Sequence, residues 1–84
     1  MIKNKWLVYL VLCLDDSLYT GVTNDLEKRM SSHKSGKGSK YIRAKGFSKL
    51  LAVKECVDKI SAMKEEYGVK QLTKENKIKY FCEK

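Results

Sequence analysis

The chain has 84 residues, enough for one small domain with a single core, so a large substrate would be met on a surface rather than in a deep cavity. Eighteen Lys and Arg against ten Asp and Glu give a formal net charge of +8, which favours a polyanionic partner, most often nucleic acid. The alternative is a charge that serves only solubility. No run approaches about 18 consecutive apolar residues, so the sequence predicts no membrane span.

Cysteine usage is typical of a reducing compartment. Cys13, Cys56 and Cys82 are widely spaced without a C-x-x-C pair, and the chain has one histidine, which argues against a structural zinc site. Residues 1–5 lead into an apolar run that Asp15 stops, and no small-residue cleavage site follows. We therefore expect no signal peptide and a cytoplasmic location.

In chain order, the sequence predicts two strands, a helix, a basic loop with one short helical turn, a third strand and two helices. Thr23-Asn24 is expected to cap the first helix, with Glu27 completing a capping box, and Asp58 and Thr73 are expected to cap the other two. This order predicts one α+β domain over residues 1–84, a small three-stranded antiparallel sheet flanked by helices. The expected ranges are strands 5–13, 17–22 and 47–56, a helix to about Lys34, a turn near Tyr41, and helices 59–71 and to about Phe81.

The hairpin loop decides whether two tyrosines share a face. A two-residue loop at Asp15-Asp16 pairs position i with 31 − i and sends Tyr9 and Tyr19 to opposite faces of the sheet. A three-residue loop that begins at Leu14 pairs i with 30 − i and puts both rings on one face. That loop type needs its third residue in the left-handed region, so it predicts a positive φ at Asp16.

The first helix carries an arginine and the only histidine along its inner side. Counted at about 100° per residue from Leu26, His33 falls at about −20° and Arg29 at about −60°. A lone histidine on such a face is more often a satisfied core residue than a functional one. An arginine beside it is less ordinary, because Arg is rarely buried without a partner and its planar fork suits phosphate or carboxylate.

Two further segments carry candidate binding residues. Glu66 falls at the boundary between the apolar and polar sides of the second long helix, although most helical glutamates are simply solvated. The segment 34–46 has basic, glycine and tyrosine residues and no acidic residue, which favours contact with a nucleic-acid backbone. A solvated mobile loop is the alternative. The candidate nucleic-acid-binding residues are Lys34, Lys37, Lys40, Tyr41, Arg43 and Lys45.

In this order and spacing, the motifs resemble those of the GIY-YIG endonucleases. The segments VYL (8–10) and YTG (19–21) stand where that family has its two tripeptides. Arg29-x-x-x-His33 resembles the motif on the family's first helix, and Glu66 resembles its metal-binding glutamate. The segment SGKGSKYIR (35–43) is similar to a motif of the small stand-alone bacterial branch, and the similarity covers nearly the whole chain.

The resemblance implies a metal-dependent endonuclease that hydrolyses DNA phosphodiester bonds, with five catalytic residues. Glu66 would bind one divalent cation, Mg²⁺ or Mn²⁺, and Arg29 would neutralise charge on the phosphorane. Tyr9 and Tyr19 would position or deprotonate the attacking water, and His33 would assist the proton transfer. Which tyrosine is the base stays open, because a phenol with a pKa of about 10 needs help in this role.

The resemblance also leaves the substrate and the activity open. We expect structured DNA, branched, flapped or damaged, in repair or recombination, with a protein partner as a source of sequence specificity. The alternative is a nucleic-acid-binding module of the same fold that cleaves poorly or not at all, and a third reading is a protein-interaction adaptor. Val22 stands where excision-repair members have a lysine that assists the water, so a base here should rely more on His33. Gly68 lies in mid-helix, at a cost of roughly 1 kcal/mol relative to Ala.

Overall fold

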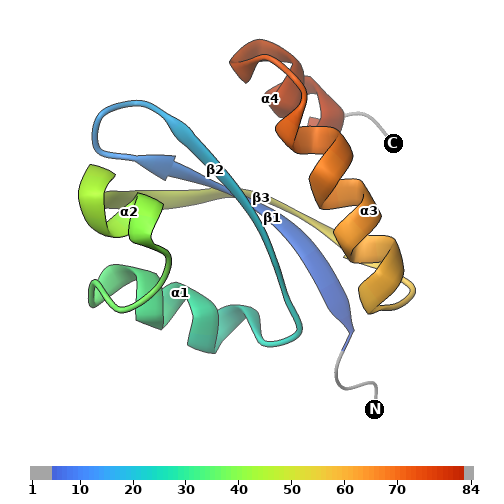
Figure 1. Ribbon diagram of the computed structural model, residues 1–84, viewed down its shortest axis with the longest axis horizontal. Helices are drawn as coiled ribbons and strands as arrows, with labels where there is room; N and C mark the ends of the chain where they lie inside the picture. The colour runs from blue at the N-terminus through green and yellow to red at the C-terminus, as the bar shows by residue number, and fades with distance from the viewer. Residues whose placement is uncertain (1–4, 83–84) are drawn as a thin grey trace.

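The computed structural model describes residues 5–82 and contains one antiparallel sheet with helices on both of its faces. The strand order is β2-β1-β3, so the first strand is central. In Figure 1, α1 and α2 lie on one side of the sheet, and α3 and α4 lie on the other. This arrangement confirms the predicted α+β fold. The elements are β1 (Trp6–Cys13), β2 (Leu18–Thr23), α1 (Leu26–Lys34), α2 (Lys40–Lys45), β3 (Phe47–Cys56), α3 (Lys59–Lys70) and α4 (Lys74–Cys82).

The central strand β1 supplies the core on both faces of the sheet. Tyr9 and Val11 are fully buried on the side of α1 and α2, where they pack with Met30 and Ile42. The alternate residue Val8 is equally buried and points to the opposite face by the period of two. Within residues 5–82, no helix has both the length and the apolar character that crossing a membrane requires.

The hairpin has the register that places Tyr9 and Tyr19 on the same face of the sheet. Val11 pairs with Tyr19 and Tyr9 pairs with Gly21, so each pair sums to 30, as the three-residue loop requires. Asp16 has a φ of 72°, which confirms the predicted left-handed residue. Tyr9 and Tyr19 therefore share one face of the sheet, with their ring centroids 6.2 Å apart.

The predicted cap of the first helix was wrong by one to two residues. Thr23 remains in β2, and its Oγ1 accepts a hydrogen bond from the backbone N–H of Asp25 at 3.0 Å. Asp25 is the N-cap instead, and its side chain accepts from the N–H of Lys28 at 3.2 Å. Glu27 is then the second residue of the helix rather than the third, so the capping box with Asn24 does not form. Asp58 caps α3 as expected, and the Thr73 side chain accepts from the N–H of Asn76 at 3.2 Å.

Candidate active site

Tyr9 reaches the site because its partner on β2 has no side chain. The ring starts from the central strand and passes across the edge strand β2 at Gly21, to which Tyr9 is paired. A Cβ at Gly21 would come within 2.5 Å of the Tyr9 hydroxyl oxygen, well inside van der Waals contact. Glycine at this position therefore makes the space that the phenol occupies, which is the physical reason for the last residue of the segment YTG.

The Tyr9 hydroxyl lies between an arginine and the histidine of α1. Its oxygen accepts a hydrogen bond from Arg29 Nε at 3.3 Å and lies 2.9 Å from His33 Nε2. Arg29 and His33 are four residues apart, so they lie one above the other on the same face of α1. The sequence predicted that both belong to the inner side of this helix, and the structure brings them to the same phenol oxygen.

Burial and charge set the protonation states of Tyr9, Arg29 and His33. Burial raises the pKa of the Tyr9 phenol above its usual 10, and the hydrogen bond from Arg29 opposes that rise only in part. Burial, followed by the positive charge of Arg29, lowers the pKa of His33 below its usual 6.5. The hydrogen bond to Tyr9 raises the pKa of Arg29. At neutral pH the site therefore holds a neutral phenol, a neutral imidazole and a charged guanidinium.

His33 is enclosed by the loop that follows its own helix. The residue is 2% exposed, and a Cβ on Gly38 would overlap Nδ1, so the backbone at Gly38 packs directly on the imidazole. Within residues 5–82, Nδ1 has no hydrogen-bond partner. The sequence predicted only that Gly38 lets the backbone come close to a ligand, and the contact with His33 was missed. Its position five residues after the histidine gave no sign that the loop folds back on the ring.

Tyr19 extends the site toward the surface. Its ring centroid lies 5.7 Å from that of His33 in an edge-to-face arrangement and 5.8 Å from that of Tyr41 on α2. Tyr19 is partly exposed, whereas Tyr9 is fully buried. The structure thus gathers Tyr9, Tyr19, Arg29 and His33 in one cluster.

Glu66 lies in the other layer of the molecule, on α3. Its side chain is 20% exposed and its Oε2 is 3.2 Å from Lys70 Nζ, one helical turn away. No hydrogen bond or ion pair joins Glu66 to the four clustered residues in the part of the chain that the structure describes. Its negative charge nevertheless contributes, after burial and the charge of Tyr19, to the raised pKa of Tyr9. Glu66 is therefore within electrostatic reach of the phenol.

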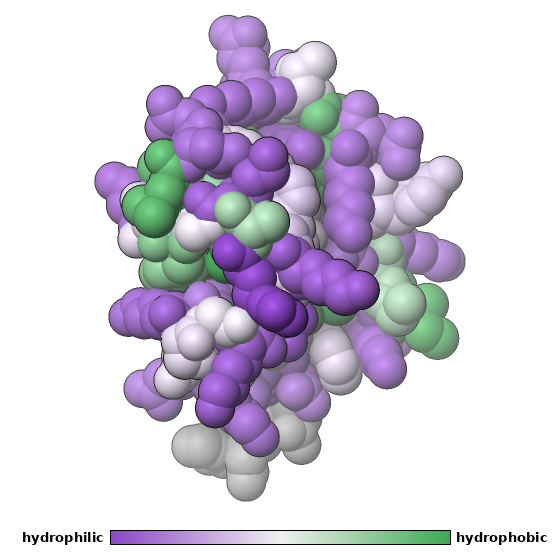
Figure 2. All heavy atoms as spheres, turned by 60° about the vertical axis from the view of Figure 1, so that its left-hand side comes forward, coloured by the Kyte–Doolittle hydropathy of each residue, from purple (hydrophilic) through white to green (hydrophobic). Residues whose placement is uncertain are grey.

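The predicted nucleic-acid-binding residues lie on α2, in the loop before it and, for Lys34, at the C-terminal end of α1. Most of them are exposed, and Figure 2, which brings the left-hand side of Figure 1 forward, shows a face covered largely by hydrophilic side chains. Lys45 pairs with Asp15 at 3.3 Å, which ties the end of α2 to the hairpin loop. Lys40 and Arg43 line a shallow hollow of about 300 Å³ on the outer side of α2.

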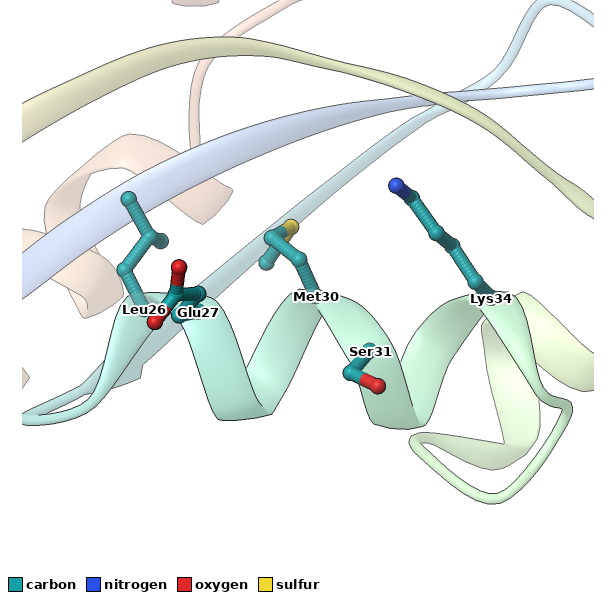
Figure 3. A pocket seen from close by; sticks show the side chains of 5 residues that line it. All are labelled: Leu26, Glu27, Met30, Ser31 and Lys34. Carbon is teal, nitrogen blue, oxygen red and sulfur yellow. The ribbon is translucent and has the colours of Figure 1, made fainter.

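Two hollows lie on opposite flanks of α1. One, of about 290 Å³, is lined by polar residues and includes Arg29, Lys28 and Ser32, so it adjoins the Tyr9 cluster. The other, of about 570 Å³, lies between α1 and the sheet, as Figure 3 shows, with Met30 and Lys34 pointing toward the strands. None of the four clustered residues lines the second hollow, so the larger space is not the site. Lys34 is the one predicted nucleic-acid-binding residue among those that line this hollow.

Comparison with known proteins agrees with this geometry. A family model described as the GIY-YIG catalytic domain matches residues 5–79. This chain belongs to the GIY-YIG family. The family is one of nucleases, and the resemblance seen in the two tripeptides and in Arg29-x-x-x-His33 is confirmed.

Relatives named UPF0213 place this GIY-YIG chain in the small single-domain branch of the family. It is 50% identical over 72 residues to the UPF0213 protein OB0043 of Oceanobacillus iheyensis, covering 86% of this chain and 84% of that protein. It is 44% identical over 78 residues to the UPF0213 protein YhbQ of Escherichia coli K12, covering 93% of this chain and 78% of that protein. The solution NMR structure of the UPF0213 protein BH0048 from Bacillus halodurans matches with a TM-score of 0.55 and 42% identity, covering 90% of this chain and 81% of that one.

Proposed function

We propose that this GIY-YIG chain is a divalent-metal-dependent endonuclease that hydrolyses phosphodiester bonds in DNA, with Tyr9 as the group that receives the proton of the attacking water. The observation that carries this proposal is the hydrogen-bonded series Arg29–Tyr9–His33, with distances of 3.3 and 2.9 Å. It sets one phenol oxygen between a fixed cation and a neutral imidazole.

The histidine overcomes the weakness of a phenol as a base. A neutral phenol with a raised pKa does not lose its proton at neutral pH, so Tyr9 alone would be ineffective. The Tyr9 O–H donates to His33 Nε2, and its proton moves there as the phenol oxygen takes a proton from water. The hydroxide oxygen then bonds to phosphorus, and the leaving oxygen departs with a proton from solvent. Val22 stands where excision-repair members of the family have a lysine that assists the water, so in this chain the proton is accepted by His33.

Arg29 has donors to spare after its bond to Tyr9. Its guanidinium carries five N–H groups, and only the one on Nε is used for the phenol. The residue also lines the polar hollow that it shares with Lys28 and Ser32. The free N–H groups would bind the scissile phosphate and stabilise the negative charge that develops on it.

The donor set around Glu66 fits one hard cation. No cluster of three or more His, Cys, Asp or Glu side chains suited to a metal occurs among residues 5–82. A single carboxylate completed by water and phosphate oxygens matches Mg²⁺ or Mn²⁺, which keep several waters, rather than zinc. Bound to Glu66, the ion would polarise the phosphate and neutralise part of its charge. Lys70, which pairs with Glu66, would then have to release it.

The basic surface supports DNA as the substrate. Lys37, in the loop that packs on His33, and Lys40 and Arg43 on α2 are exposed and suited to backbone phosphates. The elements described over residues 5–82 form one sheet with its helices, and none of them makes a second module for reading a base sequence. We therefore propose structured DNA in repair or recombination as the substrate, with sequence specificity supplied by a protein partner.

Two neighbouring glutamates provide the test. Glu66→Gln and Glu65→Gln remove the same charge from adjacent positions of α3, and Glu65 instead pairs with Lys54 at 3.3 Å. Wild type and both variants are incubated with linear, flapped and four-way-junction DNA in Mg²⁺, in Mn²⁺ and in chelator. We expect wild type and Glu65→Gln to cut with metal only, and Glu66→Gln to bind without cutting. Equal cutting by both variants would contradict the proposed metal site, and salt-sensitive binding without any cutting would favour a DNA-binding module.

A further inference from the structure

Three tyrosine rings lead from the buried site to the surface. Tyr9 is fully buried, Tyr19 is partly exposed and Tyr41 is 39% exposed. Their ring centroids are 6.2 Å apart from Tyr9 to Tyr19 and 5.8 Å apart from Tyr19 to Tyr41. These spacings are those of aromatic rings in contact. Tyr41 is thus the outer end of a series whose inner end is the candidate catalytic hydroxyl.

The short helix that carries Tyr41 is fixed at both ends. At its start, Ser39 Oγ accepts from the N–H of Ile42 at 3.3 Å, and the Ile42 side chain is buried in the core. At its end, the N–H of Leu14 donates to the Gly46 carbonyl at 2.9 Å. The Lys45–Asp15 ion pair joins the same two segments. The exposed ring of Tyr41 is therefore held in place before any ligand binds, which lowers the entropy lost on binding.

Basic residues stand beside Tyr41 on the same short helix. Lys45 Nζ lies 5.9 Å from the centroid of Tyr41. Lys40 and Arg43, on the same helix, line the hollow of about 300 Å³ on its outer side. An exposed aromatic ring beside basic side chains is the combination with which proteins hold single-stranded nucleic acid, where the base stacks and the cations take the phosphates.

We propose that Tyr41 stacks on an unpaired base next to the scissile phosphate, and that this contact selects DNA with an unpaired nucleotide at the cut site. The inference rests on the proposed nuclease function. Bases inside an intact duplex are paired and stacked, and freeing one costs a few kcal/mol. A flap, a mismatch or a branch point offers such a base at no comparable cost. The preference for structured DNA would thus depend on the side chain of Tyr41, whose ring centroid lies 5.8 Å from that of Tyr19.

The test compares two exposed tyrosines. Tyr41→Leu removes the ring, Tyr41→Phe keeps it, and Tyr67→Leu makes the same change on α3, where Tyr67 is 71% exposed. Each protein, shown by circular dichroism to be folded, is titrated onto a duplex with a one-nucleotide flap that carries 2-aminopurine and onto a blunt duplex of the same sequence. The measurements are the quenching of 2-aminopurine by stacking and the ratio of the two affinities.

We expect wild type, Tyr41→Phe and Tyr67→Leu to quench the probe and to bind the flapped duplex about 5-fold or more tightly than the blunt one, the lower end of what base–aromatic stacking contributes. Tyr41→Leu should lose both the quenching and the preference. Unchanged quenching and preference in Tyr41→Leu, or no preference in wild type, would overturn the inference while leaving cleavage to support the proposed function. If no protein shows salt-sensitive binding or cleavage of either DNA, the proposed function fails instead.

Discussion

The two faces of the sheet differ in how firmly they hold their polar residues. On the side of α1 and α2, His33 and Tyr9 are buried and hydrogen-bonded to each other, and Arg29 donates to the same hydroxyl. On the side of α3 and α4, the polar contacts include the ion pairs Lys54–Glu65 and Lys70–Glu66, in which each lysine is about half exposed and each glutamate is partly exposed. Exposed pairs of this kind contribute about 0–1 kcal/mol each.

The apolar residues do not differ in this way. α3 buries Ala62 and Val69 just as the opposite side buries Met30 and Ile42. One face therefore holds a preformed cluster of hydrogen-bonded side chains, and the other contributes a single carboxylate that is held by an ion pair with Lys70. Groups that move protons need fixed geometry, while a carboxylate that shares a cation with water and phosphate tolerates more movement. Changes on the two faces should accordingly have different consequences.

The largest effect is expected when the phenol oxygen is removed. Tyr9→Phe keeps the ring in the core but takes away the atom between Arg29 and His33. General acid–base catalysis contributes about 10²–10⁴-fold, so we expect DNA cleavage to fall at least about 100-fold. Tyr67→Phe, which removes the hydroxyl of an exposed tyrosine on α3, is the matched control and should cleave like wild type. Cleavage rates on flapped DNA measure both, and a fully active Tyr9→Phe would show that another group takes the proton.

Two glycine substitutions should change stability in opposite directions. Gly38→Ala would force a methyl group into the ring of His33, and overpacking of this kind costs about 1–3 kcal/mol. Gly68→Ala places a methyl group where no atom lies within 4 Å, inside α3, and should add about 1 kcal/mol through helix propensity. Urea denaturation gives both free energies of unfolding. A neutral Gly38→Ala would mean that the loop moves away from His33 easily, so the enclosed site would not be rigid.

The smallest effect is a dependence of stability on mildly acidic pH. Because the pKa of His33 is lowered in the folded protein, the unfolded chain takes up a proton first as the pH falls below about 6.5. Stability should therefore be full above pH 6.5 and decline below it, toward the folded-state pKa. The lowered pKa values of Asp15 and Asp58 give stability that is fully present above about pH 4 and is lost only below it, so these residues do not contribute to the decline between pH 6.5 and 5.

This pH dependence belongs to one residue, because the chain has a single histidine. His33→Gln should lose the decline between pH 6.5 and 5, measured as the free energy of unfolding in urea. Cleavage by wild type should fall over the same range, since a protonated imidazole cannot accept the Tyr9 proton. If His33→Gln keeps the wild-type slope, the imidazole is not held neutral by its surroundings.

Much of the fold could be predicted because it rests on local rules. Alternation along the strands, the turn chemistry at Asp16 and the side-chain cap at Asp58 act over a few residues, and the structure bears each of them out. The failure at Asn24 has a cause that is only partly local. Several residue types suited to capping stand in a row there, and the one chosen depends on where β2 ends, which is a matter of strand pairing.

By itself, the sequence determined the order of the elements and the inner side of α1 on which Arg29 and His33 lie, and it reduced the placement of Tyr9 and Tyr19 to two loop lengths, between which the structure decided. Those features follow from periods of two and of 3.6 residues, which hold wherever a strand or a helix forms. Only the tertiary structure decided that Arg29 and His33 meet at one hydroxyl oxygen, and that Gly38 closes over the imidazole. Such contacts join side chains on different elements or follow a turn of the chain. They depend on how the helices pack on the sheet, and no local sequence pattern determines the distance between side chains on different elements.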